Sequence, residues 1–323
     1  MYMNYNLFYI LVIITIILLL FFNINKDIFI NYSNTGLGKL IAILLIVFYA
    51  IFNIGAGIFT LILVLSYYKF YGFDSWNFIS SIDFLDGIDI IYYINLDRSK
   101  DRRENMEKIF KDPIFLGKPI NRINAIDGKD PVEQVYDKLI LNTKRNTKLE
   151  YACLLSHLTA IRKFSESSLN ETALILEDDM TIEFKRFWKK SLRTIIKEAP
   201  DDWEIIQLCY ITGGKLVADY TLNNYQRNRY GGIASMGAYI INKKAAKKLM
   251  TEMYNPETGK YTIRDYHTHE ADHYLYKVMK TYVYKWPYFI YPTVNTSTLH
   301  PEHLSSHIRS KMRLENSYNN IGM

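Results

Sequence analysis

The chain has 323 residues, of which 49% are hydrophobic and 22% are charged, and its formal net charge at pH 7 is +6. The basic residues are scattered rather than clustered, which excludes a nucleic-acid-binding surface and suits an anionic donor or a membrane surface. The two cysteines, Cys153 and Cys209, lie inside apolar segments, so buried thiols are expected and a disulfide framework is excluded.

Two apolar runs occupy the N-terminal part of the chain. The first covers residues 7–22 without interruption, and the second covers residues 40–65 with only small residues and Asn53 between its apolar side chains. A helix needs roughly 20 apolar residues to cross a bilayer. The alternative, a buried hairpin of a soluble protein, does not suit the length of the second run.

These runs define the expected domain organisation. Residues 1–66 are expected to form a transmembrane helical hairpin, with helices at about residues 5–22 and 40–66, so that the protein is integral to a membrane with two passes. Residues 67–86 form a linker, and residues 87–323 form the globular domain. The charges that flank the apolar runs do not determine on which side of the membrane that domain lies.

From Ile88 onward, short apolar runs alternate with amphipathic stretches. Such alternation predicts one α/β domain with a mainly parallel sheet. The strands are expected at residues 88–96, 119–126, 172–176, 203–210, 235–241 and 282–291, and the helices at residues 100–110, 150–164, 180–198, 243–253 and 270–280.

The apolar run that begins at Thr172 ends in three consecutive carboxylates, Glu177, Asp178 and Asp179. Ligands of parallel sheets gather just beyond the carboxyl ends of the strands, and three acids at that place repel one another unless positive charge lies among them. A divalent cation that carries a phosphorylated ligand meets this need, because Mg²⁺ and Mn²⁺ prefer oxygen donors and share them with phosphates. The alternative is a solvated loop whose acids cap the next helix.

A second polar group follows the first expected strand. Asn95 and Asp97 stand where they can hold a base or a ribose, and Arg98 and Arg102 stand where they can face a phosphate. The alternative is a capped helix start with solvated arginines. The sequence contains no glycine-rich phosphate fingerprint, so dinucleotide oxidoreductases and P-loop enzymes lose their main support.

The segment from His269 to His273 matches the HExxH pattern of zinc metalloproteases, in which both histidines project from one helix face. This alternative lacks a defined third ligand and leaves the three consecutive carboxylates unexplained. Ser156 and His157 lack the GxSxG turn of serine hydrolases, so helix packing is the alternative role. A C-terminal segment that contains His300 either closes an active site, with His300 as a metal ligand, or forms a disordered tail.

Taken in chain order, these segments resemble glycosyltransferase family 25, the lipooligosaccharide and procollagen galactosyltransferases. The resemblance runs from about Ile90 to the C-terminus and leaves the N-terminal apolar runs outside. Ala152 stands where the family usually has a glycine, and three consecutive acids replace a plain Asp-x-Asp. The similar blocks are residues 94–98 with Arg102, residues 122–128 (RINAIDG), residues 150–157 (EYACLLSH), residues 175–179 (ILEDD), residues 237–239 with Ala245, Ala246 and Leu249, and residues 271–273.

The resemblance implies a GT-A type, Rossmann-like domain that binds a nucleotide sugar and uses Mn²⁺ or Mg²⁺. It implies inverting transfer of a hexose, galactose or glucose, from a UDP-sugar to a glycan (as in lipopolysaccharide biosynthesis), a lipid-linked sugar or a hydroxylated protein side chain. A protein that binds sugar nucleotides without turnover is the further alternative. The residues implied are Asp272 as the catalytic base, Asp179 with Glu177 and His300 as metal ligands, and Asn95, Asp97, Arg98, Arg102, Glu177 and Asp178 in the nucleotide-sugar site.

Overall fold

The structure, a computed structural model, describes residues 33, 35–70, 83–131, 134–211, 224–228, 233–292 and 304–320. The chain divides into two compact units, residues 1–81 and residues 82–323. Both cysteines are free; Cys209 is buried, as expected from the sequence, whereas Cys153 is only partly buried.

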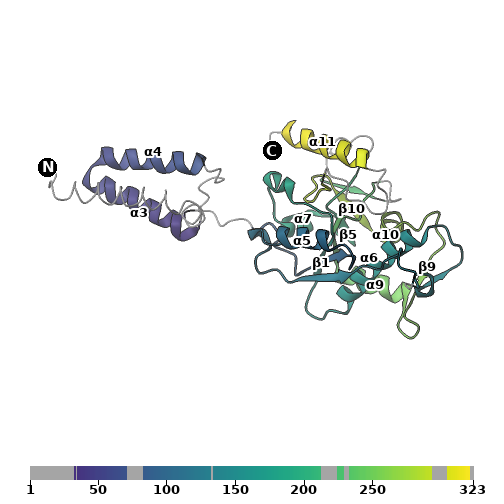
Figure 1. The fold of residues 1–323 in the computed structure, drawn as a ribbon. Coiled ribbons are helices and arrows are strands. Elements are labelled where there is room, and N and C mark those ends of the chain that lie inside the picture. The colour runs from purple at the N-terminus through teal and green to yellow at the C-terminus, as the bar shows by residue number, and fades with distance from the viewer. Residues whose placement is uncertain are drawn as a thin grey trace. The chain divides into compact units, whose positions relative to one another are not determined.

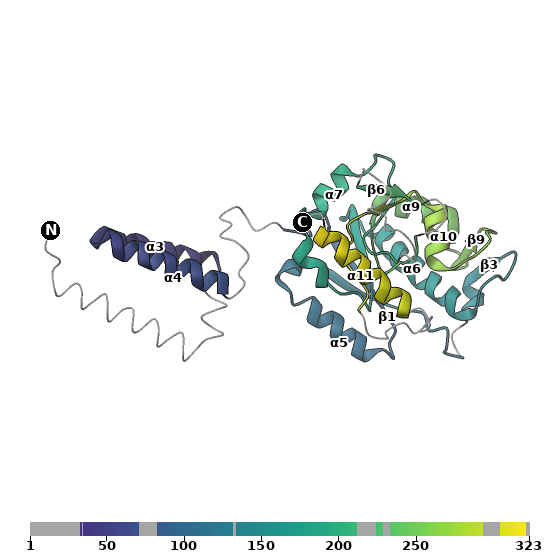
Figure 2. The same cartoon turned by 90° about the horizontal axis from the view of Figure 1, so that it is seen from above.

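In the first unit, the apolar run at residues 40–65 forms two helices rather than one. Helix α3 (Gly36–Phe52) and helix α4 (Ile54–Phe70) are separated by Asn53, whose backbone is extended, and they lie side by side in both views (Figures 1 and 2). Asn53 ends α3 and starts α4, because its side-chain oxygen accepts a hydrogen bond from the N–H of Ala56 at 3.1 Å. Gly57 then allows close packing, since a Cβ there would lie 2.5 Å from the Cβ of Ala50.

This break overturns the expectation of an integral membrane protein with two passes. Each helix has 17 residues, which at 1.5 Å per residue gives about 26 Å, less than the roughly 30 Å of a bilayer core. No helix in the described part of the chain is both long and apolar enough to cross a membrane. The first expected helix, at about residues 5–22, lies outside the described residues.

The second unit is built on a seven-stranded mixed sheet (Figure 1). Strand β1 (Ile90–Asn95) is parallel to β2 (Ile120–Asn124) and to β4 (Thr172–Glu177), and β5 (Ile205–Gln207) is parallel to β10 (Thr281–Tyr284). Strand β7 (Ala238–Asn242) runs antiparallel between β4 and β5, and β6 (Tyr225–Arg227) runs antiparallel at the edge beside β10. The mainly parallel sheet predicted from the sequence is therefore confirmed, with two reversed strands. In spatial order the strands are β2, β1, β4, β7, β5, β10 and β6.

Helices cover both faces of this sheet, because alternate side chains of its buried strands point to opposite sides. On one face, Ala173 and Ile175 of β4 pack in one core with α6 (Lys148–Glu166), α9 (Lys243–Met253) and α10 (Ala271–Val278). On the other face, Leu174 and Leu176 pack in a second core with α5 (Lys100–Ile109), α7 (Leu192–Glu198) and α11 (Leu304–Asn320).

The C-terminal helix α11 was not predicted, and it lies on the outside of the unit (Figure 2). Tyr318 anchors it: the Tyr318 ring stacks on that of Phe187 with the centroids 4.6 Å apart, and its hydroxyl donates to the carbonyl oxygen of Pro287 at 2.9 Å. The structure thus describes Leu304–Asn320 as a docked helix and not as a disordered tail.

The prediction of a single helix at residues 180–198 is wrong. A 3-10 turn, η3 (Glu183–Phe187), and the short α7 occupy this stretch, because the backbone of Trp188 is extended and Ser191 starts a new helix by accepting a hydrogen bond from the N–H of Thr194. Other elements escaped the sequence patterns because they are short: η1 (Pro113–Phe115), η2 (Tyr136–Lys138), and a small second sheet of β3 (Leu139–Leu141), β9 (Lys260–Ile263) and β8 (Tyr254–Asn255).

Candidate active site

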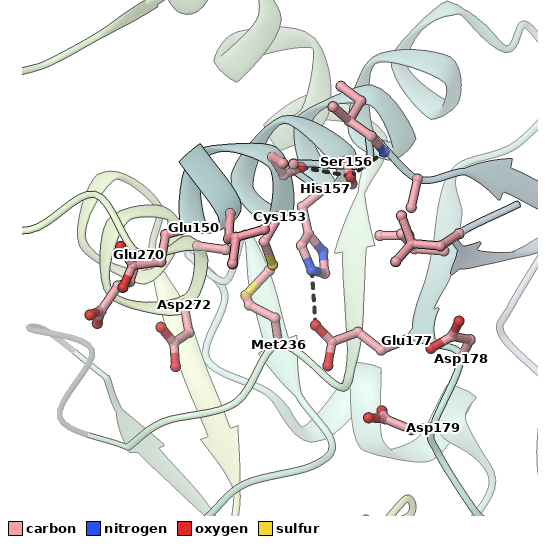
Figure 3. Close-up of a pocket in the computed structure, with 18 of the residues that line it drawn as sticks. Glu150, Cys153, Ser156, His157, Glu177, Asp178, Asp179, Met236, Glu270 and Asp272 are labelled. Atoms are coloured by element: carbon pink, nitrogen blue, oxygen red, sulfur yellow. Dashed lines mark hydrogen bonds and ion pairs between the residues drawn. The ribbon is translucent and has the colours of Figure 1, made fainter. Parts of the chain in front are cut away.

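A cavity of about 540 Å³ opens at the carboxyl ends of β1 and β4 (Figure 3). It brings together most of the residues that the sequence singled out, including Arg98, Arg102 and Asp272. One wall carries the acids at the end of β4, the second carries buried and half-buried residues of α6, and the third carries the start of α10. The polar lining includes Arg98, Arg102, Glu150, Cys153, Ser156, His157, Glu177, Asp178, Asp179, Ser235, Glu270, Asp272, His273, Tyr291 and His307.

Asp178 is a buried, fully engaged carboxylate. Its Oδ2 accepts a hydrogen bond from Asn95 Nδ2 at 2.6 Å, and its Oδ1 accepts one from Arg102 Nη1 at 2.6 Å. Burial raises the pKa of Asp178, although the Arg102 charge and the Asn95 amide oppose this rise. Positive charge among the three acids is therefore supplied in part by the protein itself.

Asp179 is buried in a different way. Its Oδ2 accepts a hydrogen bond from Arg102 Nη2 at 3.3 Å, whereas its buried Oδ1 has no hydrogen-bond partner among the described residues. Burial and the neighbouring charge of Glu177 raise the pKa of Asp179 to about 7. A buried carboxylate oxygen without a donor needs an explanation, and a cation that prefers oxygen ligands would satisfy it. The residues present therefore fit Mn²⁺ or Mg²⁺ at Asp179.

Glu177 is held from two sides. Its Oε1 lies 3.3 Å from His157 Nε2, and its Oε2 accepts a hydrogen bond from the Tyr291 hydroxyl at 3.0 Å. Burial works against ionisation of this carboxyl, but the contacts with His157 and Tyr291 outweigh it and lower its pKa. Two neighbouring acids, Glu177 and Asp179, thus have pKa values pushed apart, which is typical of functional sites.

Asn95 and Asp97 do not line the cavity. The amide of Asn95 makes four hydrogen bonds, the full number available to it: it donates to Ser99 and Asp178 and accepts from Arg103 and Arg122. It orients Asp178 from behind. Asp97 lies outside, with its side chain 67% exposed, and accepts hydrogen bonds from Arg122 at 2.6 Å and from Asn124 at 2.7 Å.

The two expected arginines differ in position. Arg102, in the first turn of α5, reaches the acids and is only 14% exposed. Arg98 stays at the rim, 44% exposed, and its Nε donates to Asp127 Oδ2 at 2.5 Å. Arg98 can therefore exchange its partner for a ligand with little loss, since an exposed ion pair contributes about 0–1 kcal/mol.

Asp272 faces the acids from the opposite wall (Figure 3). Its Oδ2 accepts a hydrogen bond from the N–H of Ser235 at 3.0 Å, and its Oδ1 accepts one from the N–H of His273 at 2.8 Å. Ser235 has a backbone φ of 107°, which residues other than glycine rarely adopt. Gln207 and Tyr276 hold it there by donating to its carbonyl oxygen.

A chain of hydrogen bonds joins the two walls. The Ser235 hydroxyl lies 3.0 Å from the Tyr291 hydroxyl, and Tyr291 in turn donates to Glu177. The same Ser235 donates its backbone N–H to Asp272. Ser235 therefore helps to position both the candidate base and, through Tyr291, Glu177 at the end of β4. Strained backbone of this kind persists where the surroundings over-determine it, often at active sites.

The HExxH pattern does not form a zincin site. Helix α10 begins at Ala271, so His269 precedes the helix while His273 lies on it. His269 is buried and its Nδ1 lies 2.8 Å from the Tyr151 hydroxyl, behind the cavity wall. Ser156 is a packing group, as the sequence allowed, because its hydroxyl donates to the Ala152 carbonyl at 2.7 Å.

The sequence comparison decides the family. A model of glycosyltransferase family 25, described as an LPS biosynthesis protein, matches residues 88–266, which is more than half of the chain. The chain belongs to glycosyltransferase family 25. The resemblance found in the sequence blocks is therefore confirmed.

Relatives of the family 25 chain match it over part of their length. A protein of Acanthamoeba polyphaga mimivirus is 30% identical over 172 residues, covering 49% of this chain and 51% of the relative. That protein is named as a glycosyltransferase. Procollagen galactosyltransferase 1 of Danio rerio is 30% identical over 135 residues, covering 38% of this chain and 21% of the relative. The chain thus spans about half the length of the first relative and about a fifth of the second.

Two solved glycosyltransferase structures are also similar, at low scores. One, involved in glycosylation of the major capsid of PBCV-1, has a TM-score of 0.36 and 12% identity, covering 67% of this chain and 98% of that one. The other, the galactosyltransferase LgtC with donor and acceptor sugar analogues, has a TM-score of 0.32 and 10% identity, covering 69% of this chain and 83% of that one.

Several cavity residues of the family 25 chain were not assigned a role from the sequence. His157 was noted only beside Ser156. Its place four residues after Cys153 on a helix is the signal that was missed, because residues at this spacing share one face. Ser235 and Tyr291 gave no pattern at all, because their roles depend on a strained backbone angle and on a long-range contact. The candidate ligand His300 lies outside the described residues.

Proposed function

We propose that this family 25 chain is a metal-dependent, inverting glycosyltransferase that moves a hexose, galactose or glucose, from a UDP-sugar. The acceptor is a hydroxyl group of a glycan, a lipid-linked sugar or a hydroxylated protein side chain. We infer a GT-A type domain for residues 87–323, supported by the mainly parallel sheet with its acids at the strand ends. The observation that carries the proposal is the buried Asp179 carboxylate, whose Oδ1 lacks a hydrogen-bond partner among the described residues.

On the donor side, the chain would hold the diphosphate between a cation and an arginine. When bound, Mn²⁺ or Mg²⁺ would neutralise the negative charge that develops on the leaving diphosphate. Asp179 would hold the cation through Oδ1, with the ionised Glu177 beside it and His300 as a further candidate ligand. Arg102 keeps a guanidinium next to these acids, where it can also face a phosphate oxygen.

On the acceptor side, Asp272 would take the proton of the attacking hydroxyl. An inverting displacement needs one carboxylate opposite the leaving group, and a positioned general base typically contributes about 10²- to 10⁴-fold. Asp272 stands across the cavity from the acids after β4, and the N–H groups of Ser235 and His273 fix its two oxygens. This support holds the carboxylate in one orientation before the acceptor arrives.

Calorimetric titration of the full-length protein with UDP, with and without Mn²⁺, tests the proposal. The wild-type protein should bind UDP in a Mn²⁺-dependent manner, and Asp179→Asn should weaken this binding by at least about tenfold, since one lost charged ligand contributes more than 1.4 kcal/mol. Asp201→Asn is a matched control, because Asp201 is an exposed carboxylate outside the cavity. Equal, Mn²⁺-dependent binding by Asp179→Asn would contradict the metal assignment.

The donor sugar is tested separately. The full-length protein should hydrolyse UDP-galactose or UDP-glucose slowly when Mn²⁺ is present, because water replaces the acceptor at a low rate. Release of UDP from neither donor, at protein concentrations where UDP itself binds, would favour a sugar-nucleotide-binding protein without turnover.

A further inference from the structure

Three potential metal ligands, a thiol, an imidazole and a carboxylate, converge on the wall of the cavity between α6 and β4. Cys153 and His157 come from α6, and Glu177 comes from the end of β4 (Figure 3). One ligand atom from each, the Cys153 Sγ, a His157 ring nitrogen and a Glu177 carboxylate oxygen, lie within 4.8 Å of one another. This cluster is distinct in its chemistry from Asp179, which offers only oxygen.

The spacing suits a tetrahedral zinc ion. Cys153 and His157 are four residues apart on one helix, so their side chains share one face. Zinc binds imidazole nitrogen and carboxylate oxygen at about 2.0–2.1 Å, which places two such ligands of a tetrahedron about 3.3 Å apart. The distance from His157 Nε2 to Glu177 Oε1 is 3.3 Å. This edge of the tetrahedron is therefore already formed in the folded protein.

The far side of the imidazole is also arranged for a metal. His157 Nδ1 lies 3.2 Å from the hydroxyl of Tyr239, which is fully buried on β7. Metal-binding histidines usually donate their second ring N–H to such an oxygen, which fixes the ring and leaves the other nitrogen free to bind. Zinc binding uses this tautomer: the Nε2 that contacts Glu177 in the metal-free protein then presents its lone pair to the ion, and the ion replaces that contact.

We propose that Cys153, His157 and Glu177 form a Zn²⁺ site, with its fourth position open to the cavity. Thiolate and imidazole ligands select Zn²⁺ over Mn²⁺ and Mg²⁺, which prefer oxygen, so the site is separate from the one at Asp179. On binding, the Cys153 thiol releases its proton to solvent as the zinc–sulfur bond forms. The site needs no residue outside the described part of the chain.

Zinc at this site inhibits sugar transfer, a consequence that rests on the proposed function. The bound ion takes Glu177 Oε1 as a ligand and, once the Cys153 proton has left, adds one net positive charge beside Asp179, which weakens the second cation there. It also places an ion and its water in the space that a donor would occupy. Zinc binding itself is independent of any transferase activity, so the two claims fail separately.

Cobalt(II) titration of the full-length protein under reducing, metal-free conditions tests the site, because a cobalt–thiolate bond gives an intense near-ultraviolet absorption band. The wild-type protein should show this band and lose it when Zn²⁺ is added. Cys153→Ser should lack the band, whereas Cys209→Ser, the matched control with the other free cysteine replaced, should keep it. Absence of the band in the wild-type protein, or its persistence in Cys153→Ser, would overturn the proposal.

A second variant separates a built site from adventitious thiol binding. Tyr239→Phe keeps all three ligands and removes only the partner of His157 Nδ1, so it should raise the Zn²⁺ dissociation constant by about 10- to 100-fold. Unchanged affinity, in a variant whose circular dichroism matches the wild type, would count against the site. For inhibition, the ratio of UDP-sugar hydrolysis with and without Zn²⁺ should be below one in Cys209→Ser and near one in Cys153→Ser; equal ratios would refute inhibition through this site.

Discussion

Replacing Asp179 with asparagine should stabilise the metal-free protein, although the same change removes cation binding. Asparagine keeps the shape of the side chain and carries no charge to bury. Burial and the Glu177 charge raise the pKa of Asp179 from the usual 3.8 to about 7, so the folded protein resists an ionisation that the unfolded chain accepts. A functional carboxylate is thus kept at the expense of stability, as is common in active sites.

The size and the pH dependence of the effect follow from the two pKa values. Below pH 3.8 the carboxyl is protonated in both states, and the wild-type protein loses no stability. Between pH 3.8 and 7 the unfolded chain releases the proton while the folded protein keeps it, so wild-type stability falls as pH rises. Above pH 7 the deficit is constant, on the order of 4 kcal/mol, whereas at pH 5 it is less than half of that.

Urea unfolding in the presence of EDTA, followed by tryptophan fluorescence, measures this difference. Three of the four tryptophans, Trp188, Trp203 and Trp286, belong to the second unit, so most of the signal reports on the domain that holds Asp179. Asp179→Asn should exceed the wild type in unfolding free energy, and by more at pH 8 than at pH 5. Mn²⁺ added in place of EDTA should raise the midpoint of the wild type alone. A variant that is no more stable at pH 8, or a gain that does not change with pH, would refute the reasoning.

Three further predictions concern the walls of the cavity. Asp272→Asn should leave Mn²⁺-dependent UDP binding intact and reduce the transfer rate by about 10²-fold or more; a variant with wild-type turnover would remove Asp272 from the base role. Ser235→Gly should be more stable than Ser235→Ala by about 1–2 kcal/mol in urea unfolding, because both lose the hydroxyl and only glycine adopts a φ of 107° without strain; equal stability would mean that the angle is not strained. Thr147→Ala should cost about 1 kcal/mol of unfolding free energy, since Thr147 and Glu150 form the capping box that starts α6; no measurable loss would show that the box contributes nothing.

The sheet that positions the site was largely predictable. Strands β1 and β4 are apolar runs bounded by polar residues, and their location inside a parallel sheet follows from that pattern alone. The acids after β4 could be placed at the carboxyl edge for the same reason. The sequence also predicted that Arg102 and Asp272 would take part in one site, and the cavity brings them together.

Other features depended on single contacts that periodicity does not contain. Asn53 breaks a long apolar run because its side chain caps the following helix, so a run that looked long enough for a membrane became two shorter helices. The stretch after Asp179 looked amphipathic, yet the extended backbone of Trp188 and the cap formed by Ser191 divide it into a 3-10 turn and a short helix. Asn95 stood where a ligand contact was expected, but all four hydrogen bonds of its amide go to other protein groups, one of them Asp178.

The central claim is that the acids at the end of β4 hold a cation against the diphosphate of a nucleotide sugar. Crystals of the full-length protein grown with Mn²⁺ and UDP, measured at the manganese absorption edge, test it most directly. The account predicts an anomalous peak within bonding distance of Asp179 Oδ1, at about 2.0–2.2 Å, with UDP phosphate oxygens completing its coordination. UDP bound in the cavity with no manganese at Asp179, or manganese bound far from β4, would contradict it.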